Sequence, residues 1–154
     1  MDPGCSRARL MSGDISHLDV GQVLVEQEYS LDREALVRYA GASGDFNPIH
    51  YREDVARSVG LPGVLAHGML TMGIAIQPLL TWCGTDYQLD SYQVRFTKPV
   101  VVDADEGASL SVTVTVGAIN QGADDPPSIR CDLHVECHAG DKVLGKAQAV
   151  IRPV

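Results

Sequence analysis

The sequence predicts an α+β fold in which a curled antiparallel sheet packs around one long apolar helix. Residues 64–85 contain no charged side chain, and a helix that is apolar on every side is buried at the centre of its own fold. The second half of the chain alternates apolar and polar residues over 91–97, 109–116 and 129–137. This alternation is typical of antiparallel strands with one solvated face.

The first half of the chain predicts one strand and three helical segments. Residues 22–29 have the pattern of a strand. The helix that follows is expected to have Ser30 as its N-cap and to end at Gly41. A short helix is expected over 53–59, and the long apolar helix then begins at about residue 67. Pro78 is expected to kink or end this long helix. A last, less regular strand is expected over 142–151.

Composition limits the domain organisation and the classes of partner. With 154 residues, of which 45% are hydrophobic, the chain is expected to form one domain with its own core. We assign residues 17–154 to that domain and residues 1–16 to a flexible tail. The net charge of −8 disfavours binding to nucleic acid, which requires clustered lysine and arginine.

Membrane insertion and export are also disfavoured. The apolar stretch 64–85 contains His67, Gln77 and Pro78 and has no flanking lysine or arginine, which argues against a membrane span. The N-terminal residues lack the apolar segment of a secretory signal. The cysteines form no Cys-x-x-Cys pair, a usage that favours reduced thiols in a cytoplasmic protein. They are Cys5, Cys83, Cys131 and Cys137.

The segment Gly-Asp-Phe-Asn-Pro-Ile-His, residues 44–50, is the first candidate site. Pro48 pushes Asn47 into an extended conformation, and Asn47 favours a turn. A bent loop of this kind can bring Asp45 and His50 side by side. Considered alone, the segment is more simply interpreted as common loop chemistry, with Asp45 as a helix cap or the partner of an arginine and His50 as a surface histidine.

The pair His67-Gly68 is the second candidate, because it stands where the long helix is expected to begin. The first N–H groups of a helix have no partner within the helix and favour negative charge, so this end can bind an oxyanion. A carboxylate, an imidazole and such an N–H together are sufficient for proton abstraction with stabilisation of an enolate.

A third group lies on one face of the strand predicted over 129–137 and just beyond it. Its members superficially resemble metal ligands. Alternate residues of a strand lie about 6.6 Å apart, so the two histidines would be about 13 Å apart and unable to share an ion. We therefore interpret this group as a solvated strand face, and no metal site is predicted. It consists of Asp132, His134, Glu136 and His138.

Residues 39–51, YAGASGDFNPIHY, and 63–73, GVLAHGMLTMG, resemble the MaoC-like hydratases and dehydratases, including the (R)-specific enoyl-CoA hydratases. The signature of that family is Asp-x-Asn-Pro-x-His followed by Ala-His-Gly-Met. The resemblance runs from about residue 17 to the C-terminus. It is strongest to the catalytic B-type subunit of the type II fatty-acid synthase 3-hydroxyacyl-ACP dehydratases, and it implies a hot-dog fold.

The resemblance also implies roles for individual residues. It assigns Asp45 and His50 to the catalytic pair and Asn47 to holding their loop. It assigns the Gly68 N–H, with His67 beside it, to binding the thioester oxygen. The implied reaction is reversible hydration of a trans-2-enoyl thioester to a (3R)-hydroxyacyl thioester, without a metal or redox cofactor.

The implied substrate is an acyl-CoA or acyl-ACP, and the implied assembly is a homodimer or a heterodimer with a second hot-dog subunit. Four cations near the motifs are candidates for the phosphate of CoA or of the carrier: Arg52, Arg57, Arg95 and Lys98. Two alternatives stay open. A hot-dog thioesterase would need Asp45 but not His50, and a non-catalytic acyl-binding subunit would need neither.

Overall fold

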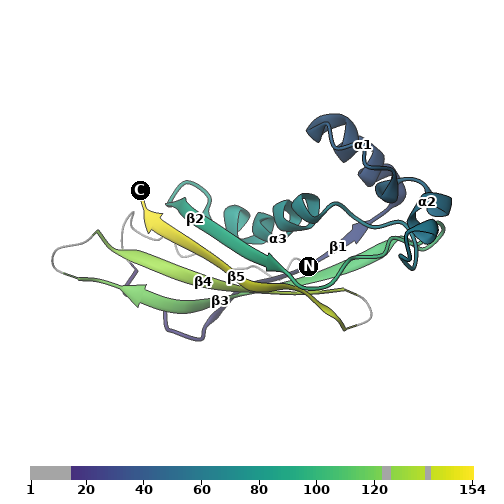
Figure 1. The fold of residues 1–154 in the computed structure, drawn as a ribbon. Coiled ribbons are helices and arrows are strands. Elements are labelled where there is room, and N and C mark those ends of the chain that lie inside the picture. The colour runs from purple at the N-terminus through teal and green to yellow at the C-terminus, as the bar shows by residue number, and fades with distance from the viewer. Residues whose placement is uncertain (1–14, 123–125, 138–139) are drawn as a thin grey trace, which may run out of the picture.

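The described part of the protein, residues 15–122, 126–137 and 140–154, forms one five-stranded antiparallel sheet in the computed structural model. The strand order is β1-β3-β4-β5-β2, so that β1 and β2 are the two edges (Figure 1). The strands are β1 (Val23–Leu31), β2 (Tyr87–Phe96), β3 (Ala108–Asn120), β4 (Ser128–Cys137) and β5 (Lys142–Pro153). The prediction of an α+β fold with an antiparallel sheet is confirmed.

The long apolar helix α3 (Gly68–Cys83) lies along one face of the sheet, as Figure 1 shows. The strand residues that face it are buried because apolar and polar side chains alternate along each strand. Those of β3 and β4 are Leu110, Val112, Val114, Val116, Ile129, Cys131, Leu133 and Val135. From α3, the side chains of Ala75, Ile76 and Leu79 meet the same core.

The opposite face of α3 is not covered by the described residues. Met69 is 59% exposed and Leu80 is 37% exposed. The sheet therefore covers one side of the helix, whereas the lack of charge along its sequence had predicted burial on every side. Within the described residues, no helix combines the length and the apolar character needed to cross a membrane.

Pro78 lies inside α3, and the helix continues beyond it to Cys83. Of the two predicted outcomes, a kink or an end of the helix at Pro78, the second is therefore excluded. A proline removes one backbone donor and loosens the carbonyls of the preceding turn. The side-chain amide of Gln77 donates to the Gly73 carbonyl oxygen at 3.0 Å, one residue before Ile74, whose carbonyl loses its donor at Pro78.

Three shorter helices precede α3: α1 (Arg33–Ser43), the 3₁₀ helix η1 (Pro48–His50) and α2 (Glu53–Ser58). The N-cap of α1 is Asp32, whose Oδ1 accepts a hydrogen bond from the Ala35 N–H at 2.8 Å. The predicted cap, Ser30, lies in β1 instead. Strand pairing continues through Leu31, opposite Ala108, and delays the start of the helix by two residues.

We expect Asp32→Ala to lower the free energy of unfolding by about 1 kcal/mol, because the Ala35 N–H loses its acceptor. Ser30→Ala is the matched control, since Ser30 is exposed in a strand and caps nothing. Urea unfolding of both variants checks this expectation. An equal loss in the two variants would contradict the assignment of the cap.

The cysteines within the described ranges are free thiols. Burial raises the pKa of Cys83 to about 11 and that of Cys131 to about 12. Cys5 lies outside the described residues. The core also contains Ile15, which is 3% exposed, so the packed domain begins before residue 17, the start predicted from sequence.

Candidate active site

Two hydrogen bonds from backbone N–H groups to side-chain oxygens bend the loop between α1 and η1. Helix α1 ends at Gly44, which adopts a left-handed conformation with φ of 77°. The Asn47 N–H then donates to Oδ1 of Asp45, and the Ile49 N–H donates to Oδ1 of Asn47, both at 3.2 Å. Asp and Asn favour such turns because their side chains reach the backbone two residues on.

This bend brings the Asp45 carboxylate next to the His50 imidazole. Oδ2 of Asp45 lies 4.0 Å from Nε2 of His50, which is too far for a direct hydrogen bond but close enough for both to hold one small molecule between them. The His50 side chain is 11% exposed and the Asp45 side chain 53% exposed. In this pair the His50 side chain is therefore buried, whereas the Asp45 side chain is accessible to solvent.

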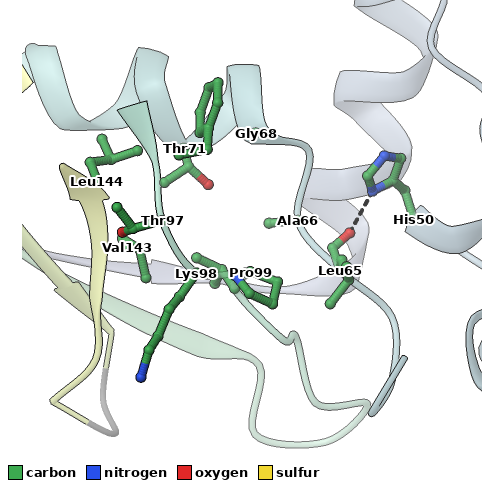
Figure 2. A pocket seen from close by; sticks show the side chains of 12 residues that line it. His50, Leu65, Ala66, Gly68, Thr71, Thr97, Lys98, Pro99, Val143 and Leu144 are labelled. Atoms are coloured by element: carbon green, nitrogen blue, oxygen red, sulfur yellow. Dashed lines mark hydrogen bonds between the residues drawn. The ribbon is translucent and has the colours of Figure 1, made fainter. Parts of the chain in front are cut away.

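The hydrogen bond of His50 decides which of its nitrogens carries the proton. Nδ1 lies 2.7 Å from the Leu65 carbonyl oxygen, drawn as the dashed line in Figure 2. A carbonyl oxygen only accepts, so Nδ1 is the donor and Nε2 presents a lone pair. The free lone pair faces Asp45 and is able to take up a proton.

Helix α3 begins at Gly68, as the sequence predicted, with His67 as its extended N-cap. No acceptor for the Gly68 N–H is found among the described residues, which is the normal state of the first turn of a helix. A Cβ at residue 68 would lie 3.2 Å from the ring of Phe96. Glycine thus lets the start of the helix lie close to the Phe96 ring at the end of β2.

A pocket of about 340 Å³ joins these groups. His50 and Gly68 both line it, and Figure 2 shows His50 at one end of the view and Val143 and Leu144 of β5 at the other. Most of the remaining wall is apolar, and Thr71 contributes a hydroxyl group. Asp45 is not part of the wall, but its carboxylate lies 4.0 Å from the wall residue His50. The other lining residues are Leu65, Ala66, Phe96, Thr97, Lys98, Pro99 and Val100.

His67 takes a place that the sequence did not indicate. Its side chain is 2% exposed and does not line the pocket. The ring stacks on that of His50, with the ring centroids 3.8 Å apart. His67 is therefore not placed to touch a bound substrate directly, although its backbone leads into the exposed N–H of Gly68.

Three of the four candidate phosphate-binding cations are engaged with carboxylates. Arg52 pairs with Asp54, Arg57 pairs with Glu53 at 2.9 Å and Lys98 pairs with Asp141 at 2.5 Å. Hydrogen bonds from Arg33 and Arg57 hold the pKa of Glu53 below its usual range. No ion pair of Arg95 is found in the described part of the chain.

Only Lys98 of these cations lines the pocket, and Figure 2 shows its side chain extending away from the other labelled lining residues. The hydrogen bond with Asp141 raises the pKa of Lys98.

Asp45, His50 and His67 bring three ligand-type atoms within 4.8 Å of one another. The planes of the two imidazoles are nearly parallel, at 22°. Imidazole lone pairs lie in the ring plane, so two stacked rings cannot direct them at one ion in the tetrahedral geometry that zinc requires. The geometry of this cluster fits proton transfer better than metal binding.

The strand-face group on β4 has a different arrangement. Nε2 of His134 lies 2.7 Å from Oε1 of Glu136, and both side chains are about half exposed. Asp132 pairs with Arg130, and His138 lies outside the described residues. These contacts agree with the interpretation of a solvated face.

Residues 18–124 match the model of the MaoC like domain family. Over 70 residues, the chain is 39% identical to the 3-hydroxyacyl-thioester dehydratase X of Mycobacterium tuberculosis, a match that covers 46% of this chain and 24% of that protein. The chain spans about a quarter or less of the length of the curated relatives it matches.

Solved structures agree with this match. One MaoC-like dehydratase has a TM-score of 0.82 and 32% identity, over 92% of this chain and 42% of the other. An R-hydratase from Pseudomonas aeruginosa has a TM-score of 0.69 and 28% identity, over 90% of this chain and 83% of the other. Because the family model covers well over half of the residues, the chain belongs to the MaoC-like domain family.

Proposed function

We propose that this chain catalyses the reversible addition of water to a trans-2-enoyl thioester, giving a (3R)-3-hydroxyacyl thioester. The observation that carries the proposal is the Asp45–His50 pair, 4.0 Å apart, together with the helix start at Gly68, which lines the same pocket as His50. The names of the relatives, a 3-hydroxyacyl-thioester dehydratase and an R-hydratase, support this reaction class.

The Asp45–His50 pair accepts a proton from the attacking water and later returns it to the substrate. Water held between Oδ2 of Asp45 and Nε2 of His50 loses a proton to the pair while its oxygen bonds to C3 of the substrate. The electron pair of the double bond moves toward the thioester carbonyl. The same proton then returns from the pair to C2, so that the net change is the addition of one water.

The start of α3 stabilises the negative charge that develops between the attack of water at C3 and the protonation of C2. As C3 is attacked, negative charge builds on the thioester oxygen, and the Gly68 N–H points its free donor at that charge. One such donor contributes about 3 kcal/mol to stabilising a transition state. Asn47 acts indirectly, because its hydrogen bonds hold the loop that carries the pair.

The substrate follows from the pocket and from its charged surroundings. The apolar wall suits an acyl chain. The CoA or acyl-carrier protein that carries the chain, here called the handle, would lie outside the pocket. For the phosphate of that handle, Arg95 is the candidate that has no ion pair in the described residues, and Lys98 is the one at the pocket. Arg52 and Arg57 would first have to leave their carboxylates.

We also propose that the chain works in the cytoplasm as a pair with a second hot-dog subunit, identical or not. Exposed apolar side chains on α3 and β2 support pairing, because such surfaces commonly mark protein contacts. They are Met69, Leu80, Leu89 and Phe96.

The proposal is tested by incubating the purified chain with crotonyl-CoA and with a longer trans-2-enoyl-CoA. We expect the enoyl absorbance to fall and a (3R)-3-hydroxyacyl-CoA to appear on chiral chromatography. Free CoA in its place would identify a thioesterase and refute the proposal. A folded protein that stays inactive with both CoA and carrier-protein substrates, with a hot-dog partner supplied, would instead indicate an acyl-binding role.

A further inference from the structure

The side chain of His67 touches both members of the Asp45–His50 pair. Its ring stacks on the ring of His50, with centroids 3.8 Å apart and planes at 22°. Its Nε2 lies 3.2 Å from the backbone carbonyl oxygen of Asp45. Because the His67 ring does not line the pocket, any effect that it has on a substrate passes through the other two residues.

The hydrogen bonds of His67 leave one of its nitrogens unpaired. The Asp45 carbonyl oxygen only accepts, so Nε2 of His67 carries the hydrogen. Nδ1 then offers a lone pair, and it is buried without a partner within the described residues. A buried polar atom left unpaired costs folding free energy, which a phenylalanine of similar shape would avoid. Such costs are expected where a residue serves a site.

The ring of His67 is itself held in place. Its backbone is the N-cap of α3, and the ring of Tyr39 from α1 contacts it edge-on, with centroids 4.9 Å apart and planes at 60°. His50, by contrast, has one ring hydrogen bond within the described residues, from Nδ1 to the Leu65 carbonyl oxygen. One hydrogen bond does not fix the plane of a ring, so without the stack on His67 the imidazole would tilt and lose its alignment with that oxygen.

We propose that His67 is a positioning residue for the hydration reaction: stacking sets the plane of the His50 ring, and the hydrogen bond fixes the Asp45 backbone. Both contacts keep Nε2 of His50 aimed at Oδ2 of Asp45 across their 4.0 Å gap. The inference rests on the function proposed above. It assigns to His67 a role through the catalytic pair rather than a contact with the substrate.

Three variants separate the two contacts. His67→Phe keeps the flat face and loses the donor, His67→Gln keeps a donor at the position of Nε2 and loses the face, and His67→Ala loses both. We expect His67→Ala to lower kcat by about 100-fold, since small misplacements of catalytic groups have effects of this size. Phenylalanine and glutamine should each restore part of the loss. KM should stay unchanged in all three variants.

The phenylalanine variant also separates positioning from mere structural support. His67→Phe removes an unpaired buried nitrogen and also one hydrogen bond, two changes with opposite effects on stability, so we expect its Tm to stay close to that of the wild type while its kcat is lower. A purely structural residue would make activity follow stability. Activity of His67→Ala close to that of the wild type, a rise in KM in place of a fall in kcat, or a phenylalanine variant no better than alanine would each overturn the proposal.

A readout independent of turnover keeps this inference separate from the proposed reaction. In ¹⁵N-histidine-labelled protein, long-range ¹H–¹⁵N spectra report which nitrogen of His50 carries the hydrogen. We expect His50 to be protonated at Nδ1 in the wild type and in His67→Phe, and to populate both tautomers in His67→Ala. An unchanged His50 signal in His67→Ala would refute the positioning role, whether or not enoyl-CoA is hydrated. An inactive wild type with the expected spectra would refute only the reaction.

Discussion

His50→Asn lowers kcat for enoyl-CoA hydration by about 100- to 10,000-fold, the usual contribution of a general acid–base group. The expectation follows from the free lone pair at Nε2, which faces Asp45 at 4.0 Å and which asparagine does not supply. The asparagine amide retains a donor close to the position of Nδ1, so the bond to the Leu65 carbonyl oxygen, 2.7 Å in the wild type, has a replacement. The loss should therefore appear in kcat, with folding intact.

Asp45→Asn should cause a loss of the same order, because an amide neither accepts a proton from water nor carries the charge of a carboxylate. The double variant should lose little more than either single variant, since two residues that act as a unit are not additive. Steady-state kinetics with crotonyl-CoA, with unfolding curves alongside, measure both effects.

His134→Asn is the matched control, because His134 is a half-exposed histidine paired with Glu136 on β4. Its activity should equal that of the wild type. If His50→Asn kept the wild-type kcat, the imidazole would have no role in the chemistry. Retention of thioester hydrolysis in that variant would favour the thioesterase, which needs Asp45 alone.

Gly68→Pro is the second change with a large expected effect, because proline has no N–H. The first position of a helix accepts proline readily, and His67, with φ of −61° and ψ of 132°, already has the conformation required before a proline. The helix should therefore form without the donor. We expect kcat to fall by about 100- to 1,000-fold, the effect of losing one oxyanion donor.

Gly68→Ala controls for the added carbon atoms. It introduces the Cβ that would lie 3.2 Å from the Phe96 ring, but it keeps the N–H. Phe96 is 50% exposed, so its ring has room to move, and the loss in this variant should be much smaller. Equal losses in kcat for alanine and proline would mean that crowding at Phe96, and not the missing donor, causes the defect.

Much of the fold could be predicted because it depends on neighbouring residues. The alternation along β3 and β4 and the uncharged run of α3 are visible in short windows of sequence. The ends of the helices and strands were harder to predict, because pairing between strands decides them. Strand β1 extends to Leu31 because Ala108 of β3 lies opposite. The N-cap of α1 is therefore Asp32 and not Ser30. The exposed side of α3 was missed because no short window shows which face the sheet leaves uncovered.

Part of the candidate site could likewise be predicted from local sequence, and part depends on residues far apart in the sequence. The bend that brings Asp45 and His50 together is local turn chemistry, centred on Asn47 and Pro48, and the free N–H of Gly68 follows from where a helix begins. The stack of His67 on His50 is not local, because it depends on how α3 approaches the loop. The pocket wall from Phe96 and Leu144 was not foreseen either, since it joins segments far apart in the sequence.

The measurement that tests the central claim most directly is the stereochemistry of hydration in D₂O. Because Asp45 and His50 lie 4.0 Å apart and act as one group in the proposed mechanism, the pair that activates D₂O at C3 should also return the deuteron to C2. The account predicts that oxygen and deuterium add to the same face of the double bond, giving one diastereomer by NMR. Addition to opposite faces, or deuterium at C2 with random configuration, would contradict proton transfer by a single pair.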